Sequence, residues 1–141
     1  MIPLLINDVP IQCIHQAAVQ YQVPAKLIIS VLKTENGRIG LAKRNYNGSY
    51  DYGPMQINSL WLPVIAKYGY TQHDIQYDAC INVKVGAWIL NQKIYDEAQV
   101  WRGVGDYNSH TPVFNQRYSQ KVYARYEKLE RALIQGQKKS F

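Results

Sequence analysis

The fold is decided by residues 24–37, which read PAKLIISVLKTENG. A proline followed by apolar residues at helical spacing predicts a helix that opens at Pro24. Its apolar face consists of Leu27, Ile28, Val31 and Leu32. The next position on that face is Glu35, and Gly37 predicts the end of the helix. This stretch therefore predicts a buried helix that presents one carboxyl group at its C-terminal end.

Glu35 is the side chain that most needs a chemical explanation. Desolvation on the apolar face raises the pKa of a carboxyl group, and the helix dipole disfavours negative charge at this end. A carboxyl that is still protonated near neutral pH is what a general acid requires. The alternative is an ordinary boundary glutamate that turns toward solvent. The helix by itself leaves both interpretations open.

The composition is that of one small globular domain. The chain has 141 residues, of which 47% are hydrophobic and 18% charged. No apolar run is long enough to span a membrane. The start, residues 1–6, lacks a basic flank and contains Pro3, so it is not typical of an intact secretory signal. Either the chain is made without a leader, or a leader was removed and a start methionine added.

Apolar spacing along the rest of the chain predicts mostly helices. We expect them at residues 11–21, 59–68, 78–90, 96–107 and 114–135, with Asp78 as the N-cap of the third of these. The Asn47-Gly48 pair is a strong signal for a tight hairpin. The predicted fold class is mainly α (α+β), with a short β-hairpin or loop lobe beside the helix that ends in Glu35.

The charge and the cysteines leave several interpretations open. The net charge is +6, but residues 1–114 hold nine Lys/Arg and eight Asp/Glu, whereas residues 115–141 hold seven and two. A basic C-terminal segment suggests an anionic partner or only a solvated helix face. Cys13 and Cys80 allow one intrachain disulfide in an oxidising compartment, or two buried thiols.

Four sequence blocks in order carry a family resemblance. Glu35-Asn36-Gly37 is followed by a Gly53-Pro54-Met55-Gln56-Ile57 block, and later by Tyr107-Asn108. Together with the two cysteines, they resemble the lytic transglycosylases of the lysozyme-like superfamily. The likeness is greatest to the small members that accompany type III and type IV secretion, pilus and conjugation systems. It covers roughly residues 11–120 and departs from the family pattern at Pro54 and at Ser109-His110.

The resemblance implies a lysozyme-like fold and a role for individual residues. Residues 1–114 would form the catalytic core, its packing helix would continue to about 135, and residues 136–141 would be a basic tail. Glu35 would be the catalytic acid and base, and a disulfide would join Cys13 to Cys80. Met55 and Gln56 would line a sugar cleft, and the Tyr107 hydroxyl would lie near the Glu35 carboxyl. The supporting residues would be Asn36, Tyr52, Met55, Gln56, Ile57, Asn58, Tyr107 and Asn108.

Some of these residues have simpler explanations. Met55 and Ile57 could be apolar residues that pack a core turn. Asp51 could bond nearby backbone amides in the hairpin, support a developing positive charge, or act as a nucleophile. Tyr46, Tyr50, Tyr52 and Trp61 could stack on sugar rings or lie on an ordinary tyrosine-rich surface.

The implied reaction is peptidoglycan cleavage at the MurNAc-β-1,4-GlcNAc bond, with one glutamate and a 1,6-anhydroMurNAc product. The cut would open the cell wall locally for a secretion, pilus or conjugation apparatus. One alternative is a hydrolytic lysozyme, including a phage-type muramidase, that uses Glu35 and Asp51. Another is a non-catalytic glycan-binding or assembly module.

The predicted partners are glycan strands and, through the basic C-terminal helix, proteins of such an apparatus, rather than nucleic acid. The dispersed histidines and the lack of a Cys/His cluster predict no metal, and we expect no cofactor. The predicted location is the periplasm or the cell wall.

Overall fold

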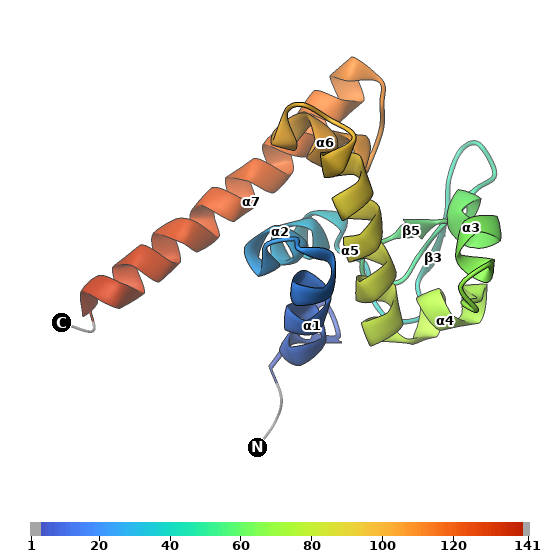
Figure 1. Cartoon of the computed structure of the whole chain (residues 1–141), viewed down its shortest axis with the longest axis horizontal. Helices are drawn as coiled ribbons and strands as arrows, with labels where there is room; N and C mark the ends of the chain where they lie inside the picture. Colours follow the sequence, from blue (N-terminus) through green and yellow to red (C-terminus); the bar gives the residue numbers. More distant parts are fainter. Residues whose placement is uncertain (1–3, 140–141) are drawn as a thin grey trace.

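The computed structural model describes residues 4–139 of the chain, with side chains up to residue 136 (Figure 1). Its helices are α1 (Ile11–Tyr21), α2 (Ala25–Glu35), η1 (Ser59–Trp61), α3 (Leu62–Ala66), α4 (Gln72–Tyr77), α5 (Ala79–Tyr95), α6 (Val100–Asp106) and α7 (Pro112–Lys139). Its strands are β1 (Leu5–Ile6), β2 (Val9–Pro10), β3 (Ala42–Arg44), β4 (Tyr50–Tyr52) and β5 (Ile57–Asn58). The predicted class, mainly α with a small β lobe, is confirmed.

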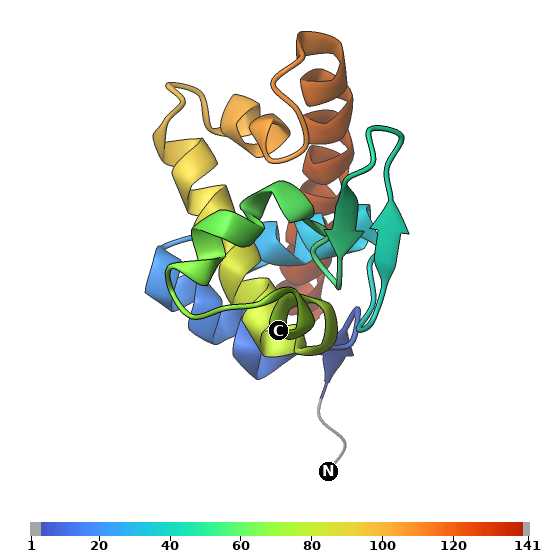
Figure 2. The same cartoon turned by 90° about the vertical axis from the view of Figure 1, so that its right-hand side faces the viewer.

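Helix α5 occupies the middle of the molecule and packs against α1, α4 and α6 (Figure 2). The Asp78 side chain accepts hydrogen bonds from the backbone amides of Cys80 and Ile81, as the predicted N-cap requires. Buried residues lie on more than one side of this helix, because neighbouring helices surround it. Both the β lobe and α6 therefore pack against this central helix.

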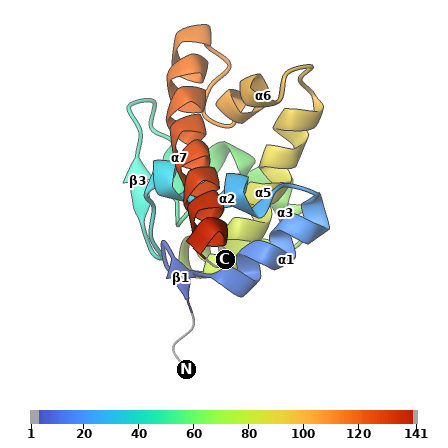
Figure 3. The same ribbon diagram turned by 90° about the vertical axis from the view of Figure 1, so that its left-hand side faces the viewer.

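Helix α2 is buried along its apolar face and is covered by α7, which crosses in front of it in Figure 3. Its predicted face is confirmed, but Gly37 does not end it. Asn36 adopts the left-handed conformation (φ 55°) that stops the helix. A glycine is needed at position 37 because the backbone packs closely there: a Cβ atom would lie only 2.1 Å from the carbonyl oxygen of Gly53. The end of α2 is thus in direct backbone contact with the turn that follows β4.

The β lobe is a three-stranded antiparallel sheet in the order β3-β4-β5. The predicted hairpin joins β3 to β4, and Gly48 takes the positive φ (86°) that its turn needs. Register pairs Asp51 of β4 with Lys43 on one side and with Asn58 on the other. The sheet therefore fixes the position of Asp51 from both neighbouring strands.

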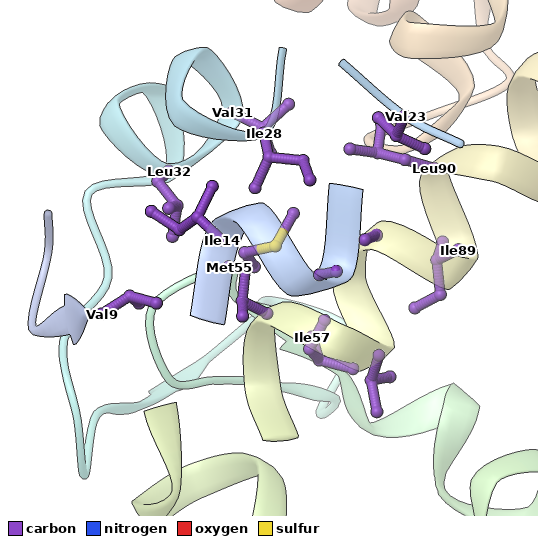
Figure 4. Packing of buried hydrophobic residues seen from close by; sticks show 14 of the residues in the cluster. Val9, Ile14, Val23, Ile28, Val31, Leu32, Met55, Ile57, Ile89 and Leu90 are labelled. Atoms are coloured by element: carbon purple, nitrogen blue, oxygen red, sulfur yellow. The ribbon is translucent and has the colours of Figure 1, made fainter. Parts of the chain in front are cut away.

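Side chains from α1, α2, α5 and the β lobe meet in one core (Figure 4). Met55 is fully buried in it, and a Cβ atom at Gly86 of α5 would lie 2.3 Å from the Met55 sulfur. A disulfide joins Cys13 of α1 to Cys80 of α5, with 5.3 Å between their Cα atoms. This bridge fastens the first helix to the central one.

Several elements differ from the sequence prediction. The short strands β1 and β2 and helix α4 were not expected, and α6 begins at Val100 rather than near residue 96. The helix expected over 114–135 extends from Pro112 to Lys139, so it contains most of the predicted 136–141 tail; residues 140 and 141 lie outside the described residues. Within the described part of the chain, every helix is too short or too polar to cross a membrane.

The disulfide should contribute strongly to stability. It closes a loop of 67 residues, so we expect the Cys13→Ser/Cys80→Ser double variant to lose about 4 kcal/mol of unfolding free energy. Urea denaturation of both proteins measures this difference. A reductant should destabilise only the parent protein. Two titratable thiols in the native, unreduced protein would contradict the bridge.

Candidate active site

Glu35 lies at the C-terminal end of α2, and its side chain lines a cleft of about 370 Å³. In Figure 2 the strands of the β lobe lie on one side of this region, with α5 and α6 on the other. Of the predicted site residues, those that line the cleft are Glu35, Asp51, Gln56, Ile57, Asn58, Tyr107 and Asn108. The Glu35 side chain is half-buried, and it lines this cleft.

The pKa of the Glu35 carboxyl is raised from 4.5 to about 7. Burial is the main cause, because a carboxylate loses its hydration there. A hydrogen bond from Tyr118 and the charge of Lys43 lower the pKa, whereas the negative charge of Asp51 raises it. A large fraction of the molecules therefore carry a protonated Glu35 at neutral pH.

Two stacked tyrosines lie behind the carboxyl, and sequence reasoning connected only Tyr107 with Glu35. The Tyr118 hydroxyl donates to Glu35 Oε2 at 2.6 Å, whereas the Tyr107 hydroxyl donates to the backbone oxygen of Met55 at 2.8 Å. The two rings stack with 6.3 Å between their centroids. Burial raises the pKa of both tyrosines well above the ordinary value, so both hydroxyls keep their protons. The predicted neighbour of the Glu35 carboxyl was Tyr107; the hydrogen-bond donor is Tyr118.

Asp51 is held in the cleft by Asn58. The Asn58 Nδ2 atom donates to Asp51 Oδ1 at 3.0 Å and to Ser49 Oγ at 3.1 Å. The Asn58 Oδ1 atom accepts from the backbone amide of Leu60, which starts the short helix η1. Asn58 thus connects the hairpin residue Ser49, strand β4 and helix η1, and it orients the Asp51 carboxylate. Asp51 is close enough to Glu35 for its negative charge to raise the pKa of Glu35.

Gln56 lines the cleft, as expected, and its side chain also holds its own turn. The Gln56 Nε2 atom donates to the carbonyl oxygen of Gly53 at 2.9 Å, and the residue has a positive φ of 53°. The turn shapes one wall of the cleft.

Asn82 of α5 holds this same turn, and sequence reasoning missed it. Its Oδ1 atom accepts from the Met55 amide at 2.8 Å. Its Nδ2 atom donates to the carbonyl oxygens of Tyr52 (2.9 Å) and Ile75 (2.7 Å). The side chain is fully buried with all these bonds made. A polar residue on the apolar surface of a predicted central helix was the signal that could have found it.

Three predicted site residues do not line the cleft. Met55 is fully buried in the core, close to Gly86 of α5, and is not among the residues that line the cleft. Tyr52 is also buried and stacks on Tyr50. Asn36 is exposed and ends α2 through its backbone conformation. Of the four aromatic residues expected to stack on sugar, Trp61 lines the cleft, while Tyr46, Tyr50 and Tyr52 do not.

The raised pKa of Glu35 makes a prediction about stability. The folded state holds the proton of the Glu35 carboxyl group more tightly than the unfolded state does. Its contribution to the free energy of unfolding is therefore full below pH 4.5 and is lost as pH rises through about 7. We expect Glu35→Gln to be more stable than the parent at pH 8 by about 3 kcal/mol, the equivalent of the pKa shift. The difference should fade toward pH 4, because both side chains are then neutral.

Urea unfolding of both proteins at pH 4 and pH 8 measures this difference. An Asp96→Asn variant is the control for removing an exposed acidic side chain outside the cleft. Equal stability of Glu35→Gln and the parent at both pH values would contradict a desolvated Glu35.

The sequence matches the transglycosylase SLT domain over residues 12–129. Invasion protein IagB of Salmonella typhimurium is 32% identical over 132 residues, which cover 90% of this chain and 82% of that protein. Protein IpgF of Shigella sonnei is 30% identical over 119 residues, 81% of this chain and 78% of its own length. A peptidoglycan-binding-like protein of Escherichia coli O157:H7 is 29% identical over 129 residues, 83% and 77% of the two chains.

The family match covers most of the chain, and it includes α2, the β lobe and the greater part of α7. It confirms the resemblance that the sequence motifs indicated, and with it the mainly helical lysozyme-like fold. The chain belongs to the transglycosylase SLT domain family.

Proposed function

We propose that this chain is a peptidoglycan lytic transglycosylase in which Glu35 acts first as the acid and then as the base. The observation that carries the proposal is the Glu35 carboxyl itself. It faces the cleft, its pKa is about 7, and Tyr118 donates a hydrogen bond to it. A group with a pKa near the working pH can both give and take a proton efficiently.

The reaction then needs no water. The protonated Glu35 gives its proton to the glycosidic oxygen, and the bond between that oxygen and C1 of MurNAc breaks. The C6 hydroxyl of the same MurNAc attacks C1, and the Glu35 carboxylate takes the hydroxyl proton. Glu35 ends in its starting protonation state, and the product carries a 1,6-anhydro ring. The Tyr118 hydroxyl stabilises the carboxylate between the two proton transfers, because it donates to the charged oxygen.

Asp51 has an electrostatic role in this proposal. Its carboxylate lines the cleft and raises the pKa of Glu35, which keeps the acid protonated before the reaction. Its negative charge also favours the positive charge that develops on the sugar during cleavage. The hydrogen bond from Asn58 holds the Asp51 carboxylate in place.

A hydrolytic lysozyme is the second candidate, because two carboxyl groups line one cleft. In that reaction Asp51 would attack C1 or support a water molecule, and the product would have a reducing end. The family match favours the transglycosylase.

The wider role that we propose is local opening of the cell wall in the periplasm, for a secretion, pilus or conjugation apparatus. The family and the names of its relatives, among them an invasion protein and a peptidoglycan-binding-like protein, support a role at the wall. The long helix α7 extends away from the body in Figure 1 and is rich in basic residues, which suits contact with an anionic wall or a partner protein.

Replacing the two carboxyl groups separately tests the mechanism. We expect Glu35→Gln to lose at least about 100-fold in cleavage of purified peptidoglycan, because it removes the proton donor. Asp51→Asn should retain more activity, since it removes only a charge. Mass spectrometry of the parent's products should show 1,6-anhydroMurNAc ends, which are one water lighter than reducing ends.

Two outcomes would contradict the proposal. Reducing ends as the main product, with Asp51→Asn as inactive as Glu35→Gln, would indicate a lysozyme. Full activity of Glu35→Gln would remove Glu35 from the mechanism, and no activity in a folded parent would favour a binding module.

A further inference from the structure

The wall of the cleft opposite the β lobe carries a cationic group that the proposed reaction does not use. Lys93 of α5 and His110, which follows α6, both line this wall. The Lys93 Nζ atom lies 3.2 Å from His110 Nε2 and 5.7 Å from the centroid of the Trp61 ring. Two neighbours from different parts of the chain therefore hold the ammonium at the cleft.

His110 is itself fixed by a buried acid. Its Nδ1 atom lies 3.3 Å from Asp106 Oδ1, and the same oxygen accepts from Asn115 Nδ2 at 2.8 Å. Asp106 is only 6% exposed. The two ring nitrogens of His110 contact Asp106 on one side and Lys93 on the other. A row of contacting polar side chains thus runs from α7 to the cleft, in the order Asn115, Asp106, His110 and Lys93.

The charge around Lys93 makes it selective. Among the described residues that line the cleft, Lys93 is the only lysine or arginine, and the acids Glu35, Asp51 and Asp106 line the same cleft. An anionic group on the substrate is therefore attracted most strongly to the wall that carries Lys93. An ammonium has three N–H donors, and the contact with His110 uses one of them.

The glycan backbone of peptidoglycan is neutral, and its carboxylates lie on the stem peptides attached to MurNAc. We propose that Lys93, held by His110 and Trp61, binds a carboxylate of the stem peptide, so that the cleft prefers strands that carry peptides. This inference rests on the proposed function, since it names the substrate form that the same cleft takes. His110 is a positioning residue, because it acts through Lys93.

The test compares cleavage of peptidoglycan strands that carry stem peptides with cleavage of the same strands after their peptide carboxyl groups have been converted to amides. We expect the parent to prefer the first substrate. Lys93→Gln should lose roughly tenfold in kcat/KM on strands with free peptide carboxylates, mainly through KM, and less than about twofold on amidated strands. Lys93→Arg should keep most of the preference, because the charge remains.

Lys84→Gln is the matched control. Lys84 lies on the same helix and also over an aromatic ring, that of Tyr70, but it does not line the cleft. This variant should cleave both substrates as the parent does. Equal losses on both substrates in Lys93→Gln, or no preference in the parent, would overturn the inference while leaving the proposed function intact.

A binding measurement separates the two proposals. Calorimetry on the Glu35→Gln background should give weaker binding of a disaccharide that bears a stem peptide when Lys93→Gln is added. Binding of the same compound with its peptide carboxyl groups converted to amides should be unchanged. This result would support the carboxylate site even if no cleavage occurred, and equal binding in both proteins would overturn it.

Discussion

The carboxyl group of Glu35 is removed from water where α2 ends, and the cost of ionising it there sets the chemistry of the site. Burial raises its pKa to about 7, and Tyr118 prevents a larger rise by donating to the carboxylate. The two effects leave a group that is stable in both protonation states. A fully exposed glutamate would be ionised before the reaction, and a buried one without a donor would give up its proton poorly.

Distant parts of the chain maintain this environment. Tyr118 lies 83 residues after Glu35, and α7 brings it into place by packing along α2. Asn82 fixes the turn after β4 through hydrogen bonds with Tyr52 and Met55, and a third bond joins it to Ile75 of α4. That turn touches Gly37 at the end of α2. The disulfide ties α5 to α1. The site therefore depends on the whole core rather than on one loop.

Local patterns predicted the elements, but not the tertiary contacts between them. Helical spacing located α2 and Glu35, and the Asn47-Gly48 pair located the hairpin, because both signals depend on nearby residues. Tyr118 lies within the helix expected over 114–135, but helical spacing does not show that its side chain meets Glu35. Met55 was ambiguous in sequence, because an apolar residue can line a cleft or fill a core, and its contact with Gly86 decides between them.

The most direct test is a titration of the Glu35 carboxyl by carbon-13 NMR, with its signal assigned by its absence in Glu35→Gln. The predicted pKa is about 7, and it should rise further in Tyr118→Phe, which removes the donor to the carboxylate. In Tyr107→Phe it should change much less, because that hydroxyl donates to Met55. A pKa near 4.5 in the parent protein would contradict a desolvated acid at the end of α2.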